Sequence, residues 1–252
     1  MKKSRLDELL LRSGLCDDLE ESRRLIGAGE VSIQGTCVDK AGVSFPDNSI
    51  LAVKSTCPYV SRGGYKLEGG LRDLQYNPEG FVCVDIGAST GGFTDCLLQH
   101  GARKVYAVDV AYGMLDWKLR QDPRVVVIER FNARKLTTEQ IPEPINLAVI
   151  DAAFISLTKL IPPLLPLFNG EISIICLIKP QFELPRKLIP KGGVVINTTD
   201  QRQTIEKIFS FINQLGLNHS AAFTSSILGS KGNKEYLIHI TGNATIILQD
   251  DP

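Results

Sequence analysis

The chain has 252 residues, and its 28 Lys and Arg residues balance its 28 Asp and Glu residues, so the formal net charge is zero. A neutral chain has no overall basic field to attract nucleic acid, and a hydrophobic content of 43% suits a globular protein with a substantial core. No apolar run is long enough to span a membrane and no apolar leader opens the chain, which predicts a cytoplasmic protein.

Residues 1–58 are predicted to form a small α+β domain. Apolar residues at helical spacing indicate one helix over 5–13 and a second that Asp17 caps and that continues to residue 26. Short strands are expected at 31–33, 37–38 and 50–53.

Four arginines on the two helices are followed by Ala-Gly-Glu-Val and a glycine, a pattern that resembles the S4 RNA-binding domain. The resemblance implies that these arginines contact RNA: Arg5, Arg12, Arg23 and Arg24. Residues 1–65 contain nine acids as well as nine bases, so specific RNA contact requires the bases to be gathered on one face. The alternative is a small domain that only packs on its neighbour.

Residues 59–65 are predicted to link this domain to the rest of the chain. Adjacent glycines at 63 and 64, between a strand and a helix, suit a hinge or a contact loop. Arg62 in this linker is a fifth candidate for RNA contact. Lys66 follows on the next helix, where a lone lysine is normally a surface residue.

The second domain, 66–252, alternates strands with segments of helix length. Apolar runs rich in Val and Ile predict strands at 81–85, 104–109, 124–128, 145–150 and 172–178. An amphipathic helix over 204–215 precedes two further strand candidates, at 221–227 and 236–240. Strands that are apolar on both faces and alternate with helices predict an α/β fold with a mostly parallel, seven-stranded sheet.

A glycine-rich loop follows the first of these strands and opens a helix. Glycines allow the backbone to turn sharply and to approach a ligand closely, and the helix start offers free N–H groups. The candidate cofactor residues in this stretch are Asp85, Gly87, Ser89, Gly91, Gly92 and Phe93. The second strand ends at Asp109, whose carboxylate suits the two hydroxyls of a ribose.

This loop lacks the G-x-G-x-x-G spacing, which disfavours a nucleotide-dependent dehydrogenase. The pattern instead suits S-adenosylmethionine, an adenosine that carries a small amino-acid tail. The alternative is a tight structural turn without a ligand.

Polar residues close the remaining strands, where ligands bind in open α/β sheets. The third strand leads to Asn132, the fourth to Asp151 and the fifth to Lys179. The alternative interpretation of Asp151 is that it serves only as a helix cap. A lysine at the end of a buried strand, balanced by carboxylates, can orient a hydroxyl and take its proton during a methyl transfer. That reaction needs no metal, and because the six cysteines form no C-x-x-C pair and the three histidines are scattered, we expect no metal site.

Six stretches, in this order along the chain, resemble motifs of the TlyA family: Val60–Leu67, Asp85–Thr94, Ala107–Gly113, Asp151–Ser156, Leu177–Glu183 and Gly232–Tyr236. That family couples an S4 domain to an FtsJ-type (RrmJ-type) domain of the Rossmann-like class I S-adenosylmethionine-dependent methyltransferases. The resemblance implies 2′-O-methylation of ribosomal RNA in ribosomal subunits or their precursors, at a cytidine of 23S or 16S rRNA or of both.

The resemblance also implies a catalytic tetrad of Lys66, Asp151, Lys179 and Glu235. It further implies that Asp85, Gly87 and Gly91 face the methionine end of S-adenosylmethionine, Asp109 its ribose and Asn132 its adenine. The chain departs from the family pattern at Ala152-Ala153 and at Ser226, which affects local loop shape and no tetrad member.

Two further expectations concern other classes of protein. The runner-up is a non-catalytic RNA-binding factor for ribosome assembly that keeps a vestigial methyltransferase fold. Family members are also labelled haemolysins, but the chain has no strongly amphipathic lytic stretch, so we expect no pore and no membrane partner. All predicted site residues come from one chain, so a monomer suffices for the site.

Overall fold

The computed structural model describes residues 3–16, 18–27, 29–53 and 57–244, so the predicted cap Asp17 lies outside the described residues. The chain divides into two compact units, Met1–Pro58 and Tyr59–Pro252. The second unit therefore begins at the first residue of the predicted linker, 59–65. The last three residues of the predicted linker form the first turn of helix α3 (Gly63–Asp73).

The first unit is a pair of helices with small antiparallel sheets. Helices α1 (Leu6–Arg12) and α2 (Leu19–Gly27) precede a sheet in the order β3-β2-β5. These strands are β2 (Val31–Ile33), β3 (Thr36–Cys37) and β5 (Leu51–Val53). The buried core joins both helices to β2 through Leu6, Leu10, Leu25, Ile26 and Val31. Sequence analysis missed the short pair β1 (Lys3–Arg5) and β4 (Ser44–Pro46).

The second unit is built on one large sheet. Among the described residues this sheet has eight strands, with β11-β13-β10-β9-β6-β7-β8 as its main order and β12 paired only to β13. The strands are β6 (Val82–Ile86), β7 (Lys104–Val108), β8 (Val125–Ile128), β9 (Leu147–Ile150), β10 (Glu171–Ile178), β11 (Asn218–His219), β12 (Phe223–Thr224) and β13 (Tyr236–Asn243). The prediction of seven strands missed β11 and made β12 too long.

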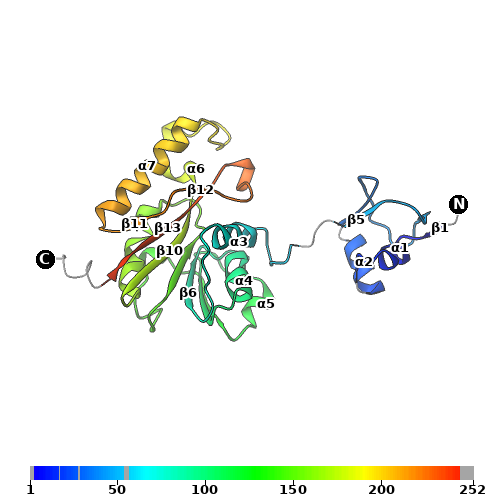
Figure 1. Ribbon diagram of the computed structural model, residues 1–252, viewed down its shortest axis with the longest axis horizontal. Helices are drawn as coiled ribbons and strands as arrows, with labels where there is room; N and C mark the ends of the chain where they lie inside the picture. The colour runs from blue at the N-terminus through cyan, green and yellow to red at the C-terminus, as the bar shows by residue number, and fades with distance from the viewer. Residues whose placement is uncertain (1–2, 17, 28, 54–56, 245–252) are drawn as a thin grey trace. The chain divides into compact units, whose positions relative to one another are not determined.

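The sheet is parallel from β8 to β10, and β13 runs antiparallel beside β10. The central strands are buried on both faces, which explains their unbroken apolar sequence. Figure 1 shows α3 and α4 (Gly92–Gln99) beside the sheet near β6, and α7 (Thr198–Gln214) beside its other half. Ile208 and Ile212 of α7 pack into the core on the face that carries Val84 and Ile150. The fold confirms the predicted α/β class with a mostly parallel sheet.

The strand order fixes where a ligand can bind. From β6 the chain first builds outward to β7 and β8, and then returns to β9 on the other side of β6. Helices on opposite faces diverge at such a switch point, so a crevice opens beyond the carboxyl ends of β6 and β9. Among the residues that the model describes, no helix is both long and apolar enough to cross a membrane.

Candidate active site

A cavity of about 1000 Å³ lies at this switch point. Its lining comes from the glycine loop after β6, the ends of β7, β9 and β10, the start of α3 and the segment before β13. Most of the predicted cofactor residues line it: Gly87, Ser89, Gly92, Phe93, Asp109 and Asn132. The two remaining residues, Asp85 and Gly91, lie outside this lining.

The glycine loop is shaped by close packing. Gly87 has φ +83°, and a Cβ there would lie 2.9 Å from Cα of Ala152, so the loop after β6 touches the loop after β9. Gly91 has φ +99°, and a Cβ there would overlap Leu119. Gly91 therefore provides the left-handed turn into α4 and faces protein rather than the cavity. A Cβ at Gly92 would lie 2.8 Å from the backbone nitrogen of Gly64, so α3 packs directly against this loop.

Asp85 is a buried carboxylate beneath the loop. Its Oδ2 accepts a 2.7 Å hydrogen bond from Oγ1 of Thr94, whereas its Oδ1 has no hydrogen-bond partner among the residues that the structure describes. Burial raises the pKa of this carboxyl to about 7; the nearby carboxylates of Asp151 and Asp109 raise it further and the Thr94 hydrogen bond opposes the shift. A buried anion with a free oxygen can attract the ammonium group of a bound amino acid.

Asp109 and Asn132 occupy the next two strand ends. Asp109 accepts 2.8 Å hydrogen bonds from the backbone nitrogens of Ser89 and Ala111, which fix its carboxylate at the mouth of the glycine loop. Asn132 caps a short turn by accepting from the backbone nitrogen of Arg134, and it lines the cavity. Asp109 and Asn132 at the cavity fit the ribose and adenine of S-adenosylmethionine in chemical type, and the buried acid Asp85 lies beneath the glycine loop next to them.

The four predicted catalytic residues converge at the same cavity. Lys66 Nζ lies 2.6 Å from Oε2 of Glu235 and 3.6 Å from Oδ2 of Asp151. Lys179 Nζ forms an ion pair with Oδ1 of Asp151 and donates a 3.3 Å hydrogen bond to its backbone oxygen. The side chain of Glu235 is 2% exposed and that of Lys179 is 9% exposed. Two lysines and two carboxylates therefore contact one another in a single cluster beside the cavity.

The cavity rim carries aromatic residues that sequence reasoning missed. Phe154 is 90% exposed although phenylalanine is normally buried, and its φ of +62° lies in the left-handed region. Its ring lies 4.9 Å from that of Phe182, and both residues line the cavity. Phe154 belongs to the quoted Asp151–Ser156 motif, but no spacing in the sequence signals that its ring faces solvent.

Arg62 also lines the cavity, as its predicted place in the linker allows.

The four predicted RNA-contact arginines of the first unit all form ion pairs. Arg5 and Arg23 both bind the buried carboxylate of Asp7, at 2.8 and 3.1 Å. The hydrogen bond from Arg5 is the main cause that lowers the pKa of Asp7 to about 2, and Arg23 adds to it. Two looser pairs complete the set: Arg12 with Asp47 and Arg24 with Glu21. Each arginine stays about half exposed, so these ion pairs still leave part of each guanidinium accessible.

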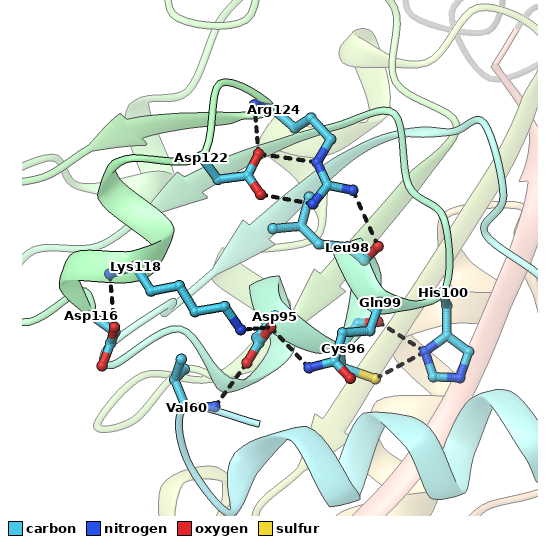
Figure 2. A network of polar contacts seen from close by, with 10 residues as sticks. All are labelled: Val60, Asp95, Cys96, Leu98, Gln99, His100, Asp116, Lys118, Asp122 and Arg124. Atoms are coloured by element: carbon cyan, nitrogen blue, oxygen red, sulfur yellow. Dashed lines mark hydrogen bonds and ion pairs between the residues drawn. The ribbon is translucent and has the colours of Figure 1, made fainter. Parts of the chain in front are cut away.

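A buried aspartate joins the linker to the helix after the glycine loop. Figure 2 shows Asp95 of α4 between Val60, Gln99 and Lys118. Its carboxylate accepts from the backbone nitrogen of Val60 at 2.8 Å and from Nε2 of Gln99 at 3.0 Å, and Nζ of Lys118 lies at 3.6 Å. The segment that enters α3 is therefore held by the same helix that the glycine loop opens.

No group of three His, Cys, Asp or Glu side chains within the described ranges could hold a metal ion. The tetrad includes two carboxylates, but each already has a lysine partner. The described residues at this cavity bring two lysines and two carboxylates together.

Comparisons with known proteins show the family of the chain. A family model described as FtsJ-like methyltransferase matches residues 59–241. The 16S/23S rRNA (cytidine-2′-O)-methyltransferase TlyA of Mycobacterium tuberculosis is 40% identical over 94% of this chain and 89% of its own length. Hemolysin A of Brachyspira hyodysenteriae is 40% identical over 93% of this chain and 98% of its own. A solved structure of a candidate hemolysin from Streptococcus thermophilus is 36% identical, covers 99% of this chain and 96% of its own, and has a TM-score of 0.74. This chain therefore belongs to the FtsJ-like methyltransferases, in the TlyA family.

Proposed function

We propose that this protein transfers the methyl group of S-adenosylmethionine to the 2′-hydroxyl of a cytidine in 23S or 16S ribosomal RNA, or in both. The convergence of Lys66, Asp151, Lys179 and Glu235 at the cavity carries the proposal. A binding module has no need of two buried lysines and two acids beside a nucleoside pocket. The names of the relatives support ribosomal RNA as the substrate, and such a substrate supports a cytoplasmic location as part of this proposal.

S-adenosylmethionine, when bound, supplies a methyl group on a sulfonium, which is electrophilic without help from a metal. Asp85, Asp109 and Asn132 hold its ammonium, ribose and adenine in this proposal, and the glycine loop gives the backbone close access to it. These three side chains each suit a different part of the cofactor, so together they favour one binding orientation. The protein then needs only to align the acceptor oxygen with the methyl group.

In its uncharged form, Lys179 would orient the ribose 2′-hydroxyl and accept its proton as the oxygen bonds to the methyl carbon and the methyl–sulfur bond breaks. Asp151 contacts both lysines and therefore fixes the position of Lys179 relative to Lys66. Glu235 fixes Lys66 from the other side. This division gives each tetrad member a role in aligning one hydroxyl.

The first unit, as an S4-like domain, binds folded RNA through Arg5, Arg12, Arg23 and Arg24, and Arg62 contacts RNA at the cavity. The target nucleotide has to leave its helix to reach a concave site, as for other enzymes that modify bases or riboses in duplexes. The exposed ring of Phe154 at the rim offers a surface on which a displaced base can stack. Stacking of this kind contributes about 1–3 kcal/mol per base.

The test is replacement of Lys179 by Ala. We expect methyl transfer to ribosomal subunits to fall by about 10²- to 10⁴-fold, the usual contribution of a general base, while S-adenosylmethionine still binds. Lys159→Ala is the matched control, because Lys159 is an exposed lysine outside the cavity lining. Full turnover by the Lys179 variant would overturn its role. Binding of ribosomal subunits without any methyl transfer by the unaltered protein would instead favour the assembly factor.

A further inference from the structure

A tight turn lies between β12 and β13, directly before Glu235. The backbone nitrogen of Gly229 donates to the oxygen of Asn233 at 2.9 Å, and that of Gly232 donates to the oxygen of Gly229 at 3.1 Å. Asn233 is 2% exposed, and its side chain accepts from the nitrogen of Val195 and donates to the oxygen of Gly193, both at 3.0 Å. These two hydrogen bonds anchor the turn to the segment before α7.

Gly229 of this turn touches the carboxylate of Glu235. A Cβ at residue 229 would overlap Oε1 and Cδ of Glu235 and would lie 3.0 Å from its Cγ. The φ of Gly229 is outside the left-handed region that favours glycine. What the position requires is therefore space rather than an unusual backbone conformation.

Glu235 cannot yield this space without losing its contact with Lys66. Its side chain is 2% exposed, and its Oε2 lies 2.6 Å from Nζ of Lys66. Rotation of the carboxylate away from a Cβ at residue 229 changes the position of Oε2 as well. Lys66 also pairs with Asp151, whose other oxygen pairs with Lys179, so a displaced Glu235 alters the support of the whole tetrad.

We propose that Gly229 is a positioning residue for methyl transfer: the absent side chain lets the anchored turn press Glu235 into the orientation that holds Lys66. This inference rests on the proposed function, because it assigns a use to the tetrad. Gly229 acts through Glu235 and not by chemistry of its own. A displacement of about 1 Å in such a site can cost about 100-fold in rate.

The experiment compares Gly229→Ala with the unaltered protein in methyl transfer to ribosomal subunits. We expect kcat to fall by about 10- to 100-fold, with the Kd for S-adenosylmethionine changed by less than about twofold, because the atoms nearest a Cβ at residue 229 belong to Glu235, which is not a predicted cofactor residue. Gly27→Ala is the control for the loss of a glycine, since a Cβ there meets no atom of the described residues within 4 Å. We expect this control to keep full activity.

Rescue separates a positioning role from simple damage to the fold. Glu235→Asp shortens the side chain by one methylene and makes room for the Cβ, so adding it to Gly229→Ala should raise kcat about fivefold or more, although Glu235→Asp alone lowers it. Glu235→Gln keeps the length and should give no rescue. Full activity of Gly229→Ala, or equal effects of Asp and Gln at residue 235, would overturn the inference. Failure of the unaltered protein to methylate any ribosomal RNA would instead refute the proposed function.

Discussion

Replacement of Asp85 by Asn should make the cofactor-free protein more stable at high pH. The folded-state pKa of this buried carboxyl is about 7, against about 3.9 in an unfolded chain. Because the folded-state pKa is raised, Asp85 stabilises the fold in its protonated form. This stabilisation is fully present below pH 4 and is lost as the pH rises through 7. Each unit of pKa difference corresponds to about 1.36 kcal/mol, so ionisation of Asp85 costs about 4 kcal/mol above pH 7.

The measurable window lies between pH 5 and pH 8. Over the two units from pH 5 to pH 7 the unaltered protein should lose about 2–3 kcal/mol of unfolding free energy relative to Asp85→Asn. Urea unfolding of both proteins at each pH measures this difference, and titrating groups remote from Asp85 cancel because both proteins contain them. The asparagine oxygen can still accept from Thr94 Oγ1, so the variant should fold.

Ionisation of Asp85 should also change the affinity of the protein for S-adenosylmethionine. An ionised Asp85 favours the ammonium of S-adenosylmethionine, so the Kd of the unaltered protein should decrease as the pH rises from 5.5 to 8, and Asp85→Asn should bind weakly at every pH. Calorimetric titration measures both trends. A stability difference that does not change with pH would refute the raised pKa, and a pH-independent Kd would refute the contact with the ammonium.

Three further predictions concern the rim, the first unit and the linker. Phe154→Gly should stabilise the protein by about 1 kcal/mol, since it relieves a left-handed φ. The same change should raise the KM for RNA in methyl-transfer assays. An unchanged KM would show that Phe154 does not contact the RNA. Joint replacement of Arg5 and Arg23 by Ala leaves Asp7 buried and unpaired and should lower the melting temperature as well as RNA affinity. The stabilisation from Asp7, whose pKa is lowered to about 2, should be present in the intact protein above pH 4 and lost as the pH falls through 2, which acid unfolding can check. Asp95→Ala removes the acceptor that holds the linker and should destabilise the second unit by about 1–3 kcal/mol in urea unfolding; unaltered stability would show that this hydrogen bond is replaced by water.

The features that could be predicted best from the sequence are those that depend on neighbouring residues, namely the central strands and their polar ends. A buried parallel strand has to be apolar along its length, so the central strands and their polar ends could be located from composition alone. The ends at Asp85, Asp109, Asp151 and Lys179 follow from this, because the carboxyl ends of parallel strands meet at one edge of the sheet. The positions of the loops around them were harder to predict.

Contacts between distant residues lay beyond pattern reasoning. Lys66 and Glu235 are 169 positions apart, and neither ends a parallel strand, so only the family resemblance suggested their roles. The turn at Gly229 is a similar case, because the apolar run 221–227 predicted a strand that the structure limits to Phe223–Thr224. Burial of Asp7 between two arginines also depends on tertiary packing that no periodicity encodes.

The most direct test of the central claim is methyl transfer from labelled S-adenosylmethionine to 30S and 50S subunits purified from a strain that lacks this gene. We predict label in ribosomal RNA at a single nucleotide in each substrate subunit, a cytidine, where the 2′-O-methyl group blocks alkaline cleavage. The Lys179→Ala variant should give no label above background under the same conditions. Binding of S-adenosylmethionine without label in either subunit would contradict the account.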